Sequence, residues 1–263
     1  MTVSEAIKVS GIDPREARLL LAEVCGFSQA SLAASPEREI PFEVENAFFE
    51  FARRRTKGEP VAYILGRKEF YGLDLAVNPS VLIPRPETEL LVDLALERNP
   101  SSVLDLGTGS GAIAIAVKFN RPETRIVAVD ADLSTLVTAK RNAAKFNLDI
   151  DFRHGRWYAP VAGERFELIA ANPPYVASGD PHLEDLRFEP RGALVSGPDG
   201  LDSVRDIAKG AVAHLVPGAW LLLEHGLGQE RAVGDLLAAA GLESITTWPD
   251  LAGIARVSGG KLK

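Results

Sequence analysis

The four residues Asn172-Pro173-Pro174-Tyr175 combine groups that could hold a planar nitrogen. Both prolines lack a backbone N–H and have a fixed φ angle, so the turn is rigid and offers mainly hydrogen-bond acceptors. The Asn172 side-chain oxygen and a backbone carbonyl can each accept one proton of an NH2 group, which directs the nitrogen lone pair toward an electrophilic methyl. Tyr175 offers a flat face to a planar target. An ordinary Asn-Pro-Pro turn is the alternative, but the position directly after an apolar run favours methyl transfer to an amide or amine nitrogen.

A second motif, VLDLGTGSGAIAIA at 103–116, has a short apolar strand, a glycine-rich turn and the start of a helix. Gly107, Gly109 and Gly111 fall within five residues, and a plain strand-to-helix turn rarely needs so many glycines. Ligands of open parallel sheets bind beyond the carboxyl ends of the strands. The turn is therefore expected to hold a cofactor. The same glycines nearly fit a dinucleotide fingerprint, so this motif alone leaves both cofactors open.

Two carboxylates stand beside the glycines. Asp105 precedes them and could pair with the cationic amino-acid part of S-adenosylmethionine, whereas it would repel a pyrophosphate. Asp130 ends the next apolar run and could accept hydrogen bonds from both hydroxyls of a ribose. A helix cap is the other interpretation of Asp130, since Asp132 and Ser134 follow. With the Asn-Pro-Pro-Tyr turn, the pattern favours S-adenosylmethionine, which would leave as S-adenosylhomocysteine.

The elements that must position these residues alternate regularly from residue 86 onward. Helices are expected at 88–98, 112–119, 134–146, 203–215 and 229–240, and strands at 103–106, 125–129, 166–171 and 220–224. Such alternation predicts an α/β fold with a mostly parallel sheet and helices on both faces. Weak strands at 244–248 and 255–258 could pair as an antiparallel edge.

The first part of the chain is expected to be helical. Asp13-Pro14 is a helix start and Gly26 a helix stop, and a second helix is expected from Phe42 to Lys57. The cations at 53–55 would complement the end of that helix, or else form a patch for a partner. The run EFYGLDLAVNPSVLIP that follows predicts a hairpin or an extended linker. We therefore expect a helical domain at 1–70, a hairpin linker at 71–85 and a catalytic domain at 86–263.

Composition narrows the class of protein. The 263 residues carry a net charge of −7, which disfavours broad binding to phosphate backbones, and no apolar run approaches the length of a membrane span. Cys25, the single cysteine, lies in an apolar helical stretch and is expected to be a packed thiol. The four histidines show no metal-ligand spacing. With no targeting segment at its start, the chain is expected to be a cytoplasmic monomer.

Taken in order, VLDLGTGSG, VAVD and NPPY resemble the class I methyltransferases that modify planar amide or amine nitrogens. A more specific likeness is carried by PVAYILGRKEFYGLDLAVNPSVLIPRPETELLVD, FEPRGALVSGPDGLDSVRDI, LLLEHGLGQ and DLAGIARV. These runs are similar to the PrmC/HemK family, the glutamine methyltransferases of peptide chain release factors. The RPETE segment at 85–89 distinguishes that family from the related ribosomal-protein glutamine methyltransferases, which share NPPY.

The resemblance implies the fold of a class I methyltransferase preceded by a small all-α domain, with class I release factors as partners. Its implied target is the glutamine of their Gly-Gly-Gln loop. Cofactor binding is implied for the residues Asp105, Gly107, Thr108, Gly109, Ser110, Gly111, Asp130, Trp157 and Asn172. Catalysis would rest on Asn172, Pro173 and Tyr175, with Pro174, Arg85 and Glu87 also contacting the target. One departure is Arg156, where the family usually has an acidic residue before Trp157, so an adenine contact from that acid is lost or replaced.

Two other classes of enzyme remain to be weighed. A nucleic-acid methyltransferase could use the same turn on a flipped base, but the acidic composition and the lack of a recognition insertion disfavour it. An oxidoreductase that binds NAD could use the glycine turn, but it would leave the Asn-Pro-Pro-Tyr turn without a purpose.

Overall fold

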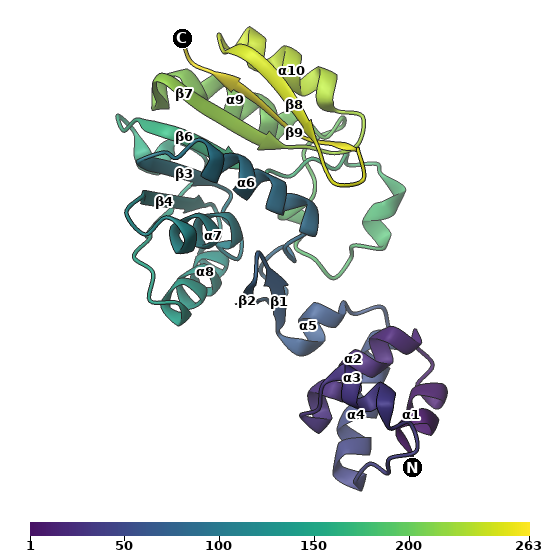
Figure 1. Cartoon of the computed structure of the whole chain (residues 1–263). Coiled ribbons are helices and arrows are strands. Elements are labelled where there is room, and N and C mark those ends of the chain that lie inside the picture. The colour runs from purple at the N-terminus through teal and green to yellow at the C-terminus, as the bar shows by residue number, and fades with distance from the viewer. The chain divides into compact units, whose positions relative to one another are not determined.

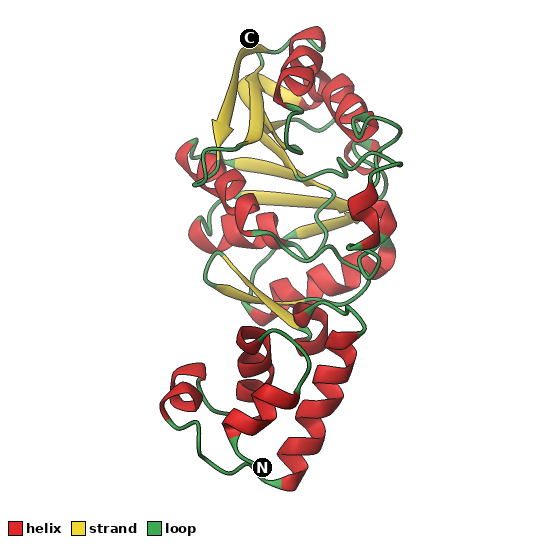
Figure 2. Cartoon of the chain, turned by 90° about the vertical axis from the view of Figure 1, so that its right-hand side faces the viewer, coloured by secondary structure: helices red, strands yellow, loops and turns green.

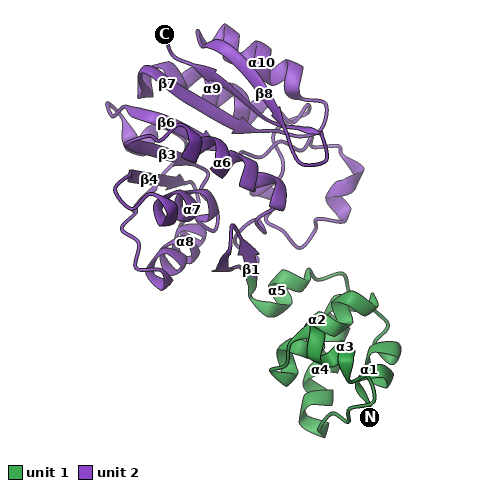
Figure 3. Cartoon of the chain, viewed as in Figure 1, with its two compact units in different colours: residues 1–67 green, residues 68–263 purple.

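The computed structural model describes residues 1–263, which form two compact units, Met1–Arg67 and Lys68–Lys263 (Figure 3). Each unit has its own apolar core. The core of the first unit draws its buried residues from 3–64, and the two cores of the second draw theirs from 70–257. None of the helices has both the length and the apolar character needed to cross a bilayer.

The first unit contains five helices, α1 (Val3–Val9), α2 (Pro14–Cys25), α3 (Gln29–Ala34), α4 (Phe42–Thr56) and α5 (Val61–Leu65). The predicted start and stop of α2 are confirmed: the Asp13 carboxylate accepts from the backbone N–H of Arg15 at 2.8 Å, and Gly26 ends the helix with φ 69°. Cys25 is half-buried against the core. The expected helix from Phe42 is α4, whereas the three shorter helices were not expected.

The cations at 53–55 are paired inside this unit. Arg53 and Arg54 donate to Glu50 and Glu59, and Arg55 donates to Glu16 of α2 at 2.7 Å. These contacts support the interpretation that the cluster stabilises the end of α4 and its packing on α2.

The expected hairpin follows, as β1 (Arg67–Phe70) and β2 (Leu73–Ala76). Its two turn residues, Tyr71 and Gly72, both have positive φ (52° and 74°), the signature of a type I′ turn. The Tyr71 N–H donates to Glu89 Oε1 at 2.8 Å, which fastens the hairpin to the start of α6 (Glu89–Glu97).

The second unit is built on a seven-stranded sheet in the order β5-β4-β3-β6-β7-β9-β8 (Figure 1). Its strands are β3 (Ser102–Leu106), β4 (Arg125–Asp130), β5 (Asp151–His154), β6 (Phe166–Ala171), β7 (Leu215–Glu224), β8 (Glu243–Pro249) and β9 (Ala255–Lys261). The first five in this order are parallel, and β9 and β8 pair antiparallel at one edge. The predicted sheet and its antiparallel edge are confirmed, and β5 is an additional strand.

Helices cover both faces of this sheet (Figure 2). They are α6 (Glu89–Glu97), α7 (Ala112–Asn120), α8 (Leu133–Lys145), α9 (Asp202–His214) and α10 (Glu230–Ala239), with single 3-10 turns at Pro86–Thr88, Ala159–Val161, Pro181–Glu184 and Arg191–Ala193. Successive strand residues enter opposite cores: in β3, Val103 packs with α6 and α7, whereas Leu104 packs with α9. Burial on both faces explains why these strands are continuously apolar.

The order of the strands creates a place for a ligand. The chain passes from β3 through α7 to β4 on one side, whereas β6 pairs with β3 on the other. Loops that leave the carboxyl ends of β3 and β6 therefore diverge, and such a switch point is where open parallel sheets bind ligands.

Candidate active site

Strand register brings the predicted site residues to one edge of the sheet. Leu106 of β3 pairs with both Val129 of β4 and Ala171 of β6. The residues that come next are Gly107 after β3, Asp130 at the end of β4 and Asn172 after β6. The glycine turn therefore lies between the Asp130 carboxylate and the Asn-Pro-Pro-Tyr turn. Residues separated by 65 positions in sequence thereby face one space.

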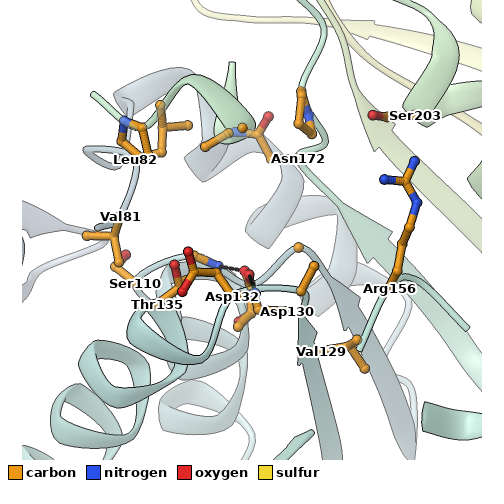
Figure 4. A pocket seen from close by; sticks show the side chains of 18 of the residues that line it. Val81, Leu82, Ser110, Val129, Asp130, Asp132, Thr135, Arg156, Asn172 and Ser203 are labelled. Atoms are coloured by element: carbon orange, nitrogen blue, oxygen red, sulfur yellow. Dashed lines mark hydrogen bonds between the residues drawn. The ribbon is translucent and has the colours of Figure 1, made fainter. Parts of the chain in front are cut away.

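That space is a cavity of about 480 Å³ within the second unit. Figure 4 shows Asp130 and Asp132 on one side of it, Asn172 opposite, and Arg156 across from Val81 and Leu82. Of the predicted site residues, the cavity is lined by Gly107, Thr108, Gly109, Ser110, Asp130, Trp157, Asn172 and Pro174.

The glycine turn owes its shape to left-handed backbone. Gly107, Gly109 and Gly111 have φ of 74°, 58° and 85°, where a side chain would be strained. A Cβ on Gly111 would also lie 2.8 Å from Cδ1 of Ile115, although Gly111 itself does not line the cavity. Glycine is required here to let the turn pass closely into α7 and leave backbone N–H groups at its N-terminus.

Asp130 is held in place by the backbone around it. Its Oδ2 accepts from the N–H of Gly109 and its Oδ1 from that of Asp132, each at 3.0 Å. Burial raises the pKa of this carboxyl above its usual value. The cap of α8 is Asp132, whose carboxylate accepts from the N–H of Ser134 at 2.7 Å. The capping alternative for Asp130 therefore does not hold, and its carboxylate faces the cavity.

Asp105 is placed differently from Asp130. It is completely buried, and its Oδ2 accepts from the Thr108 hydroxyl at 2.6 Å and from the Ala114 N–H at 3.2 Å. Its Oδ1 has no partner, and burial raises its pKa to about 7. Asp105 does not line the cavity, so its observed contacts brace the glycine turn from inside. Pairing with an ammonium group stays a prediction.

Trp157 forms one wall of the cavity with a positive φ of 48°. Its ring lies against the glycine turn, since a Cβ on Gly107 would come within 3.5 Å of it, and its indole N–H is buried without a partner. Arg156 beside it donates to Asp206 at 2.8 Å, and its guanidinium lies 5.5 Å from the centre of the Trp157 ring. The Asp206 carboxylate therefore pairs with Arg156, and Asp206 does not line the cavity.

Asn172 lines the cavity and has a side-chain oxygen that is free to accept a hydrogen bond. Its Nδ2 donates to the Thr88 hydroxyl at 3.1 Å, while its Oδ1 is buried and has no partner. An unpaired buried carbonyl oxygen costs free energy unless a donor reaches it, so this atom marks the place of a ligand N–H. Pro174 extends the same wall, whereas Pro173 is buried behind it.

Tyr175 lies outside the cavity lining, half-buried. Its carbonyl accepts from Gln229 Nε2 at 3.0 Å, and its ring packs near Gly226. Burial, and next the charge of Glu224, raise its pKa to about 12, so the phenol stays neutral. A role as a flat face for the target stays a prediction.

Arg85 and Glu87 also lie outside the cavity. Arg85 pairs with the buried carboxylate of Glu189, which in addition accepts from the Ile83 N–H at 3.0 Å. Arg85 therefore clips the segment around Glu189 to the linker before η1 (Pro86–Thr88). Contact of either residue with a target stays a prediction.

Sequence reasoning missed most of the residues that form the cavity wall. Two segments supply much of it: Ser80, Val81, Leu82 and Pro84 from the linker, and Pro190, Gly192, Ala193, Val195, Ser196, Gly197, Asp202 and Ser203 from the segment before α9. Thr88, Asp132 and Thr135 also line it. The run FEPRGALVSGPDGLDS could have indicated the second segment, because it follows β6, leads into α9 and is rich in turn residues.

Comparison with known proteins separates the remaining classes of enzyme. The PrmC N-terminal domain matches residues 3–66 and the methyltransferase small domain matches residues 86–185. The release factor glutamine methyltransferase of Neisseria gonorrhoeae is 45% identical over 99% of this chain and 98% of its own. That of Burkholderia pseudomallei is 44% identical over 99% of this chain and 96% of its own.

The chain belongs to the release factor glutamine methyltransferase family. This enzyme therefore has a class I methyltransferase domain preceded by a helical PrmC N-terminal domain, as its sequence resemblance implied. Solved structures agree on the fold: the T. thermophilus 16S rRNA N2 G1207 methyltransferase has a TM-score of 0.57 at 21% identity, over 75% of this chain and 50% of its own. A methyltransferase from Pyrococcus furiosus has a TM-score of 0.57 at 17% identity, over 80% of this chain and 96% of its own.

Proposed function

We propose that this enzyme transfers a methyl group from S-adenosylmethionine to a glutamine of class I peptide chain release factors. The acceptor is the side-chain amide nitrogen of the glutamine in their Gly-Gly-Gln loop. The observation that carries the proposal is Oδ1 of Asn172, a buried acceptor without a partner on a residue that lines the cavity beside the glycine turn. Membership of the release factor glutamine methyltransferase family supports the choice of target.

The residues of the cavity fit S-adenosylmethionine. Asp130 presents a carboxylate that can accept from the ribose hydroxyls, and Trp157 presents an aromatic wall to the adenine. The turn of Gly107 to Gly111 leaves room for the amino-acid part, and the start of α7 at Ala112 and Ile113 brings the N-terminal end of a helix to the cavity beside it. When bound, the cofactor supplies a methyl group on a sulfonium, which needs no further activation.

The protein's own task is then to position the amide. Asn172 Oδ1 accepts one proton of the glutamine NH2, and a backbone carbonyl of the rigid Asn-Pro-Pro-Tyr turn accepts the other. Both bonds hold the nitrogen with its π lone pair toward the methyl carbon. Bound S-adenosylmethionine would supply the methyl group and leave as S-adenosylhomocysteine, and the methylated nitrogen would release one proton toward solvent. Orientation of this kind can lower a barrier by several kcal/mol, on the order of 7–11 in favourable cases.

A protein substrate would account for the regions of the chain that methyl transfer itself does not require. An amide is a weak nucleophile and free glutamine is a common metabolite, so the enzyme must recognise the surface around one glutamine. We assign this recognition to the helical unit, to Arg85 and Glu87, and to the segment that follows Tyr175. The glycines that precede the target glutamine would let its loop enter a narrow site. A role in translation termination supports a cytoplasmic location, and we propose that the enzyme acts there as a monomer.

Mass spectrometry of a release factor incubated with this enzyme and S-adenosylmethionine tests the proposal. We expect one added methyl group, located on the glutamine of the Gly-Gly-Gln loop. A release factor with alanine at that glutamine is the control and should gain none. Methylation of DNA or RNA without any on the release factor would overturn the assignment of the substrate.

A further inference from the structure

Gln229 ends the run LLLEHGLGQ, to which methyl transfer as proposed gives no role. It stands directly before α10, and its half-buried side chain makes three hydrogen bonds. Its Nε2 donates to the carbonyl oxygen of Tyr175 at 3.0 Å and, across a longer 3.4 Å, to that of Asp199. Its Oε1 accepts from the backbone N–H of Gly226 at 2.9 Å. One amide group therefore joins the loop between β7 and α10 to two segments that are distant in the sequence.

The three partners fix which way this amide points. The Gly226 N–H can only donate, so it requires the amide oxygen, and the two carbonyls can only accept, so they require the amide NH2. Neither carbonyl receives another hydrogen bond from the protein. The NH2 group has one proton for each of them. Glutamine satisfies all three partners at once, whereas a glutamate of the same size would put a carboxylate against two carbonyl oxygens.

Tyr175 and Asp199 belong to the two segments that form one wall of the cavity. Tyr175 ends the Asn-Pro-Pro-Tyr turn, and Asp199 lies in the segment 190–203, which leads into α9 and supplies Ser203 to the wall. Figure 4 shows Asn172 of the turn and Ser203 both lying across the cavity from Asp130. Gln229 therefore ties one part of this wall to the other.

This tie lies where the two segments come closest. Beyond the turn they are paired by backbone, since the N–H of Ser178 donates to the carbonyl of Gly197 at 2.8 Å. The chain then returns toward Tyr175, and a Cβ on Gly200 would lie 2.2 Å from the Tyr175 carbonyl oxygen and 2.8 Å from Gln229 Nε2. Because two carbonyl dipoles converge here on a single nitrogen, the close approach depends on the donors of Gln229.

The tie reaches Asn172 through a short, stiff piece of chain. Two prolines separate Asn172 from Tyr175, and their fixed φ angles leave little freedom between the two ends. The Asn172 side chain is held separately, by its bond to the Thr88 hydroxyl at 3.1 Å. Asp130 and the glycine turn, on the proposed cofactor side, have hydrogen bonds of their own. A change at Gln229 should therefore act on the target side of the cavity.

We propose that Gln229 is a positioning residue, which ties the Asn-Pro-Pro-Tyr turn to the segment 190–203 and so sets the place of Asn172 and the shape of the wall around the target. This inference rests on the proposed function, in which Asn172 and its turn hold the target amide. Gln229 does not line the cavity, so it acts through these two segments and not by contact with the target. Its loss slows methyl transfer while the cofactor still binds.

Kinetics of the full-length enzyme on an intact release factor test this role. Gln229→Glu keeps the size of the side chain and an acceptor for the Gly226 N–H, but it removes both donors. We expect kcat to fall about tenfold to a hundredfold, with the dissociation constant of S-adenosylmethionine changed less than about threefold. Gln29→Glu makes the same substitution at an exposed glutamine of α3 and should leave both quantities unchanged.

A pH profile separates the missing donor from general damage to the structure. A carboxyl group that lies between two carbonyls has a raised pKa, and once it is protonated its O–H can donate to the Tyr175 carbonyl. The ratio of kcat in Gln229→Glu to kcat in the wild type should therefore rise at least about threefold as the pH is lowered from about 8 to about 6. Gln229→Ala has no group to protonate there, so its ratio should stay constant.

The outcomes are distinct. If the wild type methylates the release factor and Gln229→Glu does so equally fast, the positioning role is wrong and the proposed function stands. A loss of kcat matched by an equal loss of cofactor affinity, or a ratio that does not change with pH, would also overturn the role, because either indicates a merely structural effect. A wild type that methylates no release factor would overturn the proposed function and this inference together.

Discussion

The backbone N–H of Gly109 donates to the Oδ2 of Asp130 across 3.0 Å. This bond joins the glycine turn after β3 to the end of β4, the two places that the sequence singled out for the cofactor. It holds the Asp130 carboxylate at one oxygen, while the Asp132 N–H holds the other. The carboxylate therefore has a defined direction before any ligand arrives, and its remaining lone pairs face the cavity.

Removal of this carboxylate should weaken cofactor binding. Asp130→Ala loses charge-assisted hydrogen bonds to the ribose, which we expect to cost about 1.5–3 kcal/mol of binding free energy, roughly a 10- to 100-fold higher dissociation constant. Isothermal titration calorimetry with S-adenosylmethionine measures it. Asp149→Ala, at an exposed position outside the cavity, should leave the affinity unchanged. An unaltered affinity in Asp130→Ala would remove Asp130 from the cofactor site.

Substitution at Asn172 should affect chemistry more than cofactor binding. Asn172→Ala deletes the unpaired Oδ1, an acceptor that matters most while the target nitrogen attacks. We expect kcat to fall about 100-fold or more, with a much smaller change in the affinity for S-adenosylmethionine. Turnover assays with a release factor, run beside calorimetry, separate the two effects. Near-normal turnover would show that Asn172 is a turn residue only.

The parts of this fold that could be predicted from sequence are those in which the local conformation or burial of a segment restricts its residue types. The glycine turn requires positive φ, and buried parallel strands require continuous apolar runs, so both were visible. β5 was missed because its residues Asp151–His154 are mostly polar and partly exposed, and it pairs on one side only. It leaves no apolar pattern to recognise.

Contacts made across long stretches of sequence could not be predicted. The segment before α9 reaches the cavity because the N–H of Ser196 donates to the carbonyl of Val176 at 2.9 Å, and that of Ser178 to Gly197 at 2.8 Å. Thr88 meets Asn172 across 84 positions. Neither pairing leaves a periodic or compositional signal. The same limit explains Tyr175, whose place in the motif indicated a substrate face but whose ring packs outside the cavity near Gly226.

Gly200 should be sensitive to substitution because it lies against the Asn-Pro-Pro-Tyr turn. A Cβ there would lie 2.2 Å from the carbonyl oxygen of Tyr175, and its φ is 78°. Gly241 is the matched control, since its φ is 91° and a Cβ there meets nothing within 4 Å. Both alanine variants incur the strain of positive φ, about 1 kcal/mol, but Gly200→Ala should lose a further ~1–3 kcal/mol of unfolding free energy and also turnover. Urea unfolding of both variants measures the difference, and equal losses would contradict the contact.

Glu224 should make the stability of the enzyme depend on pH. Burial raises its pKa from 4.5 to about 7 in the folded state, so between these values the folded chain keeps a proton that the unfolded chain has lost. The stabilisation is complete below pH 4.5 and is lost as pH rises to about 7. Glu224→Gln cannot lose that proton, so relative to the wild type it should gain about 2–3 kcal/mol at pH 8 compared with pH 5. Denaturant unfolding at both pH values tests this, and a parallel pH dependence of the two proteins would contradict it.

The last prediction concerns the helical unit, Met1–Arg67. The buried cores of the second unit contain no residue of the first, so a chain of residues 68–263 should fold, as circular dichroism can verify. Every proposed cofactor residue is retained, and the affinity for S-adenosylmethionine should change less than about threefold. If remote contacts position the release factor, kcat/KM on the intact protein should fall at least ~10-fold.

A short Gly-Gly-Gln peptide provides the decisive control. It lacks the surface that we assign to recognition by the helical unit, so the full-length enzyme should methylate it much more slowly than the intact release factor, and deletion of 1–67 should leave that slow rate unchanged. The ratio of the two rates, protein over peptide, is therefore the quantity to compare between the full and shortened chains. A ratio that stays the same after the deletion would show that the helical unit takes no part in recognition, and equal rates on peptide and protein in the full-length enzyme would remove remote recognition altogether.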